Sequence, residues 1–232
     1  IRRNRAERNV AGIEVENTIG ADVYDNVATE NTGGILVFNM PNLPQPGSQT
    51  RVYNNHVFGN NTGNFGHAGT PVASIPAGSG VVVNSNDLVE IFDNDISDNR
   101  TANIIISSLH STGYSSYSVQ DDFDPYPEGI FIHGNRFTGG GDNPDGLELQ
   151  GLKLLIAGPL GRMPDVLWDG YQNDAKLVDG VMPDNLRICL DNGASELVNA
   201  DGPHEYANPA LTTDQHRCTL PRLPVIELAS AQ

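Results

Sequence analysis

Val23-Tyr24-Asp25-Asn26 is followed by Val27-Ala28-Thr29-Glu30-Asn31 and then by Gly34-Ile35-Leu36-Val37. The same succession recurs along the chain: an apolar residue three positions before an Asn, then a short alternating segment, then a second apolar strand. The Asn that marks each of the five copies is Asn4, Asn26, Asn55, Asn94 or Asn135. A repeat with a period of roughly 20–50 residues is typical of a solenoid.

Each copy is expected to form three short strands separated by bends. Successive side chains of a strand point to opposite faces, so each strand contributes an inward row that stacks copy on copy. The expected rows are Val23, Val52, Ile91 and Ile132; Ala28, Val57, Ile96 and Phe137; and Ile13/Val15, Ile35/Val37, Val81/Val83, Ile104/Ile106 and Leu147/Leu149. Three such rows predict an all-β, right-handed parallel β-helix of about five to six coils, each of roughly 22 residues plus insertions.

The repeated Asn residues are interpreted as bend formers. Asn tolerates the left-handed backbone conformation that a sharp bend requires. Stacked Asn26, Asn55, Asn94 and Asn135 are expected to form a ladder inside one bend, and we assign them no catalytic role.

The repeat resembles the parallel β-helix repeat family, which has the pectin-lyase-like fold. The stretch Ile188-Cys189-Leu190-Asp191-Asn192-Gly193, with the later His216-Arg217-Cys218-Thr219-Leu220-Pro221, is similar to one group within it. That group consists of exported bacterial proteins, often lipoproteins, encoded beside a predicted exported c-type cytochrome-like protein. The resemblance covers nearly the whole chain. It implies a periplasmic, outer-membrane-associated or extracellular location and an exported partner, but no activity, because one fold hosts many functions.

Charge and hydropathy narrow the classes of partner. The formal net charge is −16, and Lys153 and Lys176 are the two lysines of the chain. Such a balance argues against binding nucleic acid or an anionic membrane surface. No apolar run approaches the length of a membrane span.

The chain is expected to form one structural domain in three parts. Coils occupy residues 1–157, an excursion occupies 158–184, and 185–232 form a last degenerate coil and a proline-rich tail. The chain begins inside a repeat, so we expect the natural protein to be longer at its N-terminus. In an exported chain Cys189 and Cys218 are expected to form a disulfide that straps the tail, with two unrelated buried thiols as the alternative.

The insertions between repeats indicate where a binding site lies. They fall at 40–48, 61–79, 109–127 and 138–145, on either side of one strand of each copy, and loops on a rigid scaffold commonly carry function. In the pectin-lyase-like fold such loops build the substrate cleft. The outward residues of that face are Glu14 and Glu16, Leu36 and Phe38, Val82 and Asn84, Ile105 and Ser107, and Glu148 and Gln150. Its centre is apolar and must be covered, so we expect the cleft to be partly filled by its own loops.

Candidate site residues lie mainly in these loops. His67 and His110 are the best general acid–base candidates, with Asp122 as a third catalytic candidate. The substrate-binding candidates are Tyr114, Tyr117, Phe123, Tyr126 and Arg162.

The densest acidic cluster suggests one cation site. Its members are Asp121, Asp122, Asp124 and Glu128, and carboxylates gathered in one flexible loop suit Ca²⁺. A solvated acidic loop is the alternative. The sequence has no phosphate loop, dinucleotide fingerprint or Cys-x-x-Cys-His haem motif, so no other cofactor is predicted.

Two main hypotheses about function remain open at this stage. The first is an exported scaffold that binds a partner protein or glycan through the loop-decorated face, without catalysis. The second is a carbohydrate-active enzyme, either a polysaccharide lyase, an epimerase or a hydrolase. A chain of charge −16 repels a polyanionic substrate unless Ca²⁺ bridges them. A purely structural segment of a larger surface protein is a third, weaker hypothesis.

Overall fold

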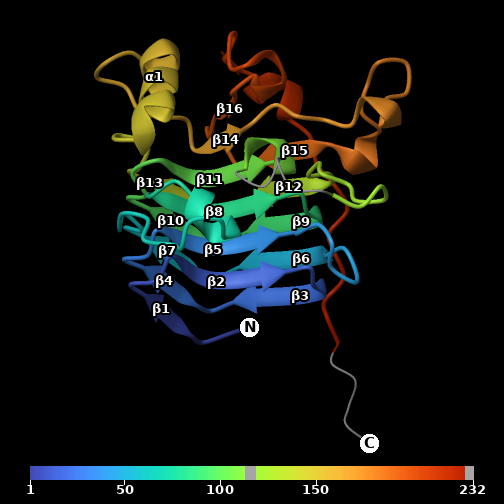
Figure 1. Cartoon of the computed structure of the whole chain (residues 1–232), viewed down its shortest axis with the longest axis horizontal. Coiled ribbons are helices and arrows are strands. Elements are labelled where there is room, and N and C mark those ends of the chain that lie inside the picture. Colours follow the sequence, from blue (N-terminus) through green and yellow to red (C-terminus); the bar gives the residue numbers. More distant parts are fainter. Residues whose placement is uncertain (113–118, 228–232) are drawn as a thin grey trace, which may run out of the picture.

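The computed structural model describes residues 1–112 and 119–227. Within these residues the fold is mostly β, with three sheets, called A, B and C, and one α-helix (Figure 1). Sheet A contains β3 (Ile19–Tyr24), β6 (Ser48–Tyr53), β9 (Asp87–Phe92), β12 (Ile130–His133) and β15 (Ile188–Asp191). Sheet B contains β1 (Arg5–Glu7), β4 (Val27–Thr29), β7 (His56–Phe58), β10 (Asp95–Ser97) and β13 (Arg136–Thr138).

Sheet C is the longest of the three. It contains β2 (Ala11–Glu16), β5 (Gly33–Phe38), β8 (Ser79–Asn84), β11 (Ala102–Ser107), β14 (Val166–Trp168), β16 (Leu197–Asn199) and β17 (Ala210–Leu211). All described strand pairs are parallel except β16 with β17. Short 3₁₀ turns lie at Pro71–Ser74, Leu109–Ser111, Asp174–Lys176, Asp184–Leu186, Gly202–His204 and Thr213–His216.

The chain passes through sheets A, B and C in turn. β3, β4 and β5 make one pass, and β6, β7 and β8 make the next, so each of these passes adds one strand to each sheet; the last pass adds β15 to sheet A and β16 to sheet C. In Figure 1 these passes lie one above another, from β1 and β3 up to β14 and β15. The arrangement is consistent with the solenoid that the repeat predicts. No helix among the described residues has the length and apolar character needed to cross a membrane.

The predicted inward rows form the core between the sheets. Val23, Val52, Ile91 and Ile132 are consecutive register partners in sheet A, and all four are fully buried. The register of sheet B likewise aligns the second predicted row: Ala28, Val57, Ile96 and Phe137. Full burial of one such aliphatic side chain stabilises the fold by about 1.5–3 kcal/mol. The first two predicted rows are therefore confirmed, with Phe137 at the end of the second row only partly buried.

The strand expected at Leu147–Leu149 is wrong, because this segment belongs to the helix α1 (Gly146–Ala157). Gly-Leu-Glu-Leu alternates as a strand would, but the run continues without a bend through residues of high helix propensity. The helix ends at Gly158, whose positive φ of 71° suits a helix C-terminus. The place in sheet C predicted for Leu147–Leu149 is occupied by β14, in which Val166 pairs with Ile104.

The Asn stacking is confirmed, with one correction to its role. The Nδ2 atoms of Asn26, Asn55 and Asn94 each lie 2.9 Å from Oδ1 of the ladder Asn in the next pass. The left-handed backbone falls on the residue before each ladder Asn, for example Asp25 at φ 54° and Asp93 at φ 52°. The ladder Asn therefore supplies hydrogen bonds at the bend, and its neighbour supplies the turn. A second ladder joins Asn31, Asn60 and Asn99.

The C-terminal tail is attached as predicted. Cys189 on β15 and Cys218 form a disulfide across a sequence separation of 29. Beyond it, the chain descends along the edge of the stack occupied by sheet A (Figure 1).

Candidate functional site

A groove of about 930 Å³ lies on the outer face of sheet C. Its floor is a row of aliphatic side chains on four neighbouring strands: Leu36, Val82, Ile105 and Leu167 are consecutive register partners. Neighbouring strands lie about 4.8 Å apart, so the row is about 14 Å long. Leu167 pairs with Ile105 and so occupies the place expected for Glu148, which lies instead in α1.

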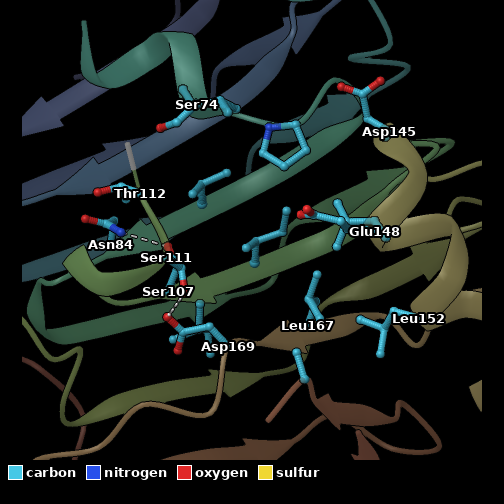
Figure 2. Close-up of a pocket in the computed structure, with 18 of the residues that line it drawn as sticks. Ser74, Asn84, Ser107, Ser111, Thr112, Asp145, Glu148, Leu152, Leu167 and Asp169 are labelled. Carbon is cyan, nitrogen blue, oxygen red and sulfur yellow. Dashed lines mark hydrogen bonds between the residues drawn. The ribbon is translucent and has the colours of Figure 1, made fainter. Parts of the chain in front are cut away.

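The groove has two unlike walls (Figure 2). One is the loop segment 71–76, and the other is α1, whose Leu152 packs against the same cluster as the floor. Leu147 and Leu155 of α1 also line the groove but stay 86% and 72% exposed. The apolar floor thus continues onto side chains that are open to solvent.

A polar strip borders the aliphatic row. Ser107 is the register partner of Asn84 and accepts a hydrogen bond from the Asn84 amide at 2.9 Å. Asp169 follows β14, and its Oδ2 accepts hydrogen bonds from the backbone N–H and hydroxyl of Ser108 and from the Ser111 hydroxyl, at 2.6, 2.8 and 2.7 Å. Burial raises the pKa of the Asp169 carboxyl, and these hydrogen bonds act against that rise.

The charged residues that line the groove are all acidic. They are Asp145, Glu148, Asp169 and Glu205, and no Lys, Arg or His is among the described lining residues. Arg100, outside the groove, forms an ion pair with Asp145 at 3.1 Å. The groove therefore favours an occupant with an apolar body and a positive group.

The predicted catalytic residues do not line this groove. His67 and Asp122 are exposed on their loops. The ring of His110 packs against the rings of Tyr126 and Tyr171, with centroids 5.5 and 5.0 Å apart, whereas its neighbours in the chain line the groove. The three candidates do not form one cluster on the groove floor.

The predicted substrate-binding residues are also dispersed. Tyr114 and Tyr117 lie outside the described residues. Phe123 and Tyr126 are half-buried and do not line the groove. Arg162 lines a separate polar pocket that also contains Arg100. Within the described residues, side chains of α1 and of the 71–76 segment pack against the apolar face.

The acidic cluster differs from the predicted cation site. Asp121 and Asp122 are exposed, whereas Asp124 and Glu128 converge with Asp87, with one carboxylate oxygen of each within 4.8 Å of the others.

A lysine neutralises part of this cluster. Lys176 donates hydrogen bonds to both Asp124 and Glu128, the first at 2.6 Å. Burial, followed by the charges of Asp124 and Glu128, raises the pKa of Asp87 to about 7. An ammonium group thus occupies the position between two of the carboxylates.

Sequence reasoning missed Asp169 and Asp87. Asp169 lies within the stretch interpreted as an excursion, although Val166-Leu167-Trp168 before it is a short continuous apolar run of the kind that forms a buried strand. Asp87 opens β9, and its sequence context gives no sign that it meets a distant loop.

No family model matches the chain, and no curated protein or solved structure matches it either.

Proposed function

We propose that the chain is a right-handed parallel β-helix scaffold that binds a partner protein, without catalysis, through the groove on sheet C. The occupant is an extended segment with apolar side chains and at least one Lys or Arg. The observation that carries this proposal is the aliphatic row of Leu36, Val82, Ile105 and Leu167 between two raised walls.

The chemistry of the floor favours a polypeptide over a glycan. Aliphatic side chains gain free energy by removing other apolar groups from water, whereas sugars present hydroxyl groups that need hydrogen-bonding partners. The aliphatic row itself offers no hydrogen-bonding side chain, and the polar strip at Asn84, Ser107 and Asp169 lies along its border. The exposed leucines of α1 enlarge the apolar surface toward a partner, as expected of an interaction site.

Charge supplies the second part of the recognition. The groove carries acidic side chains on a chain of net charge −16. Such a field steers a basic partner toward the site and disfavours acidic ones. An acidic polysaccharide is therefore a poor occupant, and the candidate acid–base residues of the enzyme hypothesis lie elsewhere.

The compartment is part of the proposal. A disulfide is typical of an oxidising environment, so the partner is sought among exported proteins. The c-type cytochrome-like protein implied by the resemblance is the first to test.

The proposal is tested with Val82→Lys, which places a charge on the floor, and with Glu148→Lys, which reverses a charge on the wall. Proteins captured from a native extract are identified, and their affinity is measured with each variant. We expect both variants to weaken binding about ten-fold or more. His56→Lys, on the exposed side of sheet B, is the matched control and retains binding.

Cross-linking then maps the bound segment of the partner. An apolar segment containing Lys or Arg supports the proposal. Equal binding by folded Val82→Lys protein, or capture of a polysaccharide that Val82→Lys leaves unchanged, contradicts it.

A further inference from the structure

The C-terminal segment 218–227, called the strap, crosses the whole of sheet A. At one end Cys218 is bonded to Cys189 on β15. At the other end Ile226 lies against Gly20 on β3, where an added Cβ would be 3.2 Å from Ile226 Cδ1. Four strand-to-strand steps separate β15 from β3, or about 19 Å. The residues from Cys218 to Ile226 reach about 26–29 Å when fully extended. The same residues in a helix would span only about 12 Å, so the strap crosses the sheet as an open, non-helical segment, as Figure 1 shows.

Arg222 anchors the middle of the strap. Its guanidinium lies 2.9 Å from Oε1 of Glu90 and also contacts Nε2 of His133. The backbone N–H of Leu223 donates to Glu90 Oε2 at 3.0 Å. Glu90 and His133 lie on the outer face of sheet A, yet they are only 2% and 5% exposed.

The strap stabilises the charged form of the buried Glu90 carboxylate. Burial alone would raise the pKa of Glu90, but hydrogen bonds from Arg222, His133 and the Leu223 backbone outweigh it and lower the pKa. A buried carboxylate without such partners would be costly. On the outer face of sheet A, the buried Glu90 carboxylate is therefore stabilised by pairing with a cationic, hydrogen-bonding group such as the Arg222 guanidinium.

The rest of this face is aromatic. Arg222 lies over the rings of Phe92 and Phe131, at 5.3 and 5.9 Å from their centroids. The rings of Tyr24, Tyr53, Phe92 and His133 stack in a column across four strands. The strap reads Pro221-Arg222-Leu223-Pro224. Proline-containing extended segments that dock on aromatic surfaces are a recurrent mode of peptide recognition, because little conformational entropy is lost on binding.

We infer that the outer face of sheet A is a recognition surface for an extended, proline-flanked arginine segment, and that the strap occupies it as an intramolecular ligand. The disulfide keeps the strap at high effective concentration, so it outcompetes the same sequence supplied from another molecule. A segment in trans binds when the anchor of the strap is weakened. This inference concerns sheet A and does not depend on the groove on sheet C.

The test uses the full chain and a fluorescent peptide with the sequence of residues 219–227. Arg222→Ala removes the anchor but leaves the receiving face unchanged. We expect this variant to bind the peptide about ten-fold tighter than the wild type, because its internal competitor is weaker. A peptide with Ala in place of the arginine should bind neither protein. Arg217→Ala is the matched control, because Arg217 bonds to Gly193 and Ser195 rather than to this face.

The outcome is read from fluorescence anisotropy together with the melting temperature and the state of the disulfide. A folded, oxidised Arg222→Ala protein that gains no affinity overturns the inference, as does equal binding of the arginine-free peptide. If Arg222→Ala does not fold, Arg222→Lys is used. It keeps the charge but loses the planar fork, and an affinity for the peptide no higher than that of the wild type then overturns the inference.

Discussion

The side-chain amide of Asn94 donates a hydrogen bond to Oδ1 of Asn135, 41 positions later in the chain, at 2.9 Å. The same amide donates to the carbonyl of Val52, and Oδ1 of Asn94 accepts from both the backbone and side-chain nitrogens of Asn55. Asn94 is 2% exposed. A buried donor or acceptor left without a partner costs about 1–3 kcal/mol. Each ladder residue therefore depends on the ones before and after it.

Asn94→Ala is expected to lower the free energy of unfolding by about 2–5 kcal/mol, because it leaves buried groups of Asn55 and Asn135 unpaired. Urea denaturation followed by circular dichroism measures the change. Asn185→Ala, at an exposed position, should change stability by less than about 0.5 kcal/mol. Equal effects of the two substitutions would contradict the role assigned to the ladder.

Gly80→Ala tests how closely adjacent passes approach each other. An added Cβ would lie 2.3 Å from the backbone oxygen of Asn103 and 2.9 Å from Nδ2 of Asn99. Neither atom belongs to a flexible chain end, so we expect a loss of about 2–4 kcal/mol. Gly151→Ala is the control, because α1 leaves open space at that position. There Ala is expected to stabilise the helix by about 0.5–1 kcal/mol. A neutral Gly80→Ala would show that the passes can separate.

The sequence predicted the parts of the fold that depend on local periodicity. The inward position of Val23 and Val52 follows from alternation alone, and the Asn spacing places their passes in register. The Cys189–Cys218 bond followed from an even count of Cys in a chain expected to be exported.

The remaining features depend on contacts that no local pattern encodes. Gly-Leu-Glu-Leu at the start of α1 has the alternation of a strand over four residues. The whole segment Gly146–Ala157 nevertheless forms a helix. The candidate site shows the same limit. The apolar character of Leu36 and Val82 could be predicted from the sequence, whereas the placement of Asp169 in the same groove needs the chain to return to sheet C after α1.

Removal of the disulfide should destabilise the protein mainly at the end of the stack. With Cys189 and Cys218 both replaced by Ala, we expect a loss of about 3–4 kcal/mol, the chain-entropy value for a loop of this length. Ala is preferred to Ser because Cys189 is fully buried and a hydroxyl there would lack water. Chemical reduction of the wild type should give a similar loss in denaturation experiments. A loss below about 1 kcal/mol would mean that noncovalent contacts of the strap already hold it in place.

Asp87 makes the stability of the fold depend on pH. Burial and the nearby Asp124 and Glu128 raise the pKa of Asp87 from 3.8 to about 7. Between these values the folded state binds a proton that the unfolded state has lost, so stability falls as pH rises from 3.8 to about 7 and then levels off. Asp87→Asn removes this titration and keeps an oxygen for the backbone N–H of Glu128.

The two proteins should therefore be about equally stable near pH 4, with Asp87→Asn more stable near pH 8. We expect a difference of about 1–3 kcal/mol at the higher pH, reduced from the full shift because Asp87 is only half-buried. Denaturation curves recorded from pH 4 to 8 measure it, with exposed Asp121→Asn as the control. A difference between Asp87→Asn and wild type that stays constant across this range would show that Asp87 does not titrate there, and that Lys176 neutralises the cluster more completely than its contacts with Asp124 and Glu128 indicate.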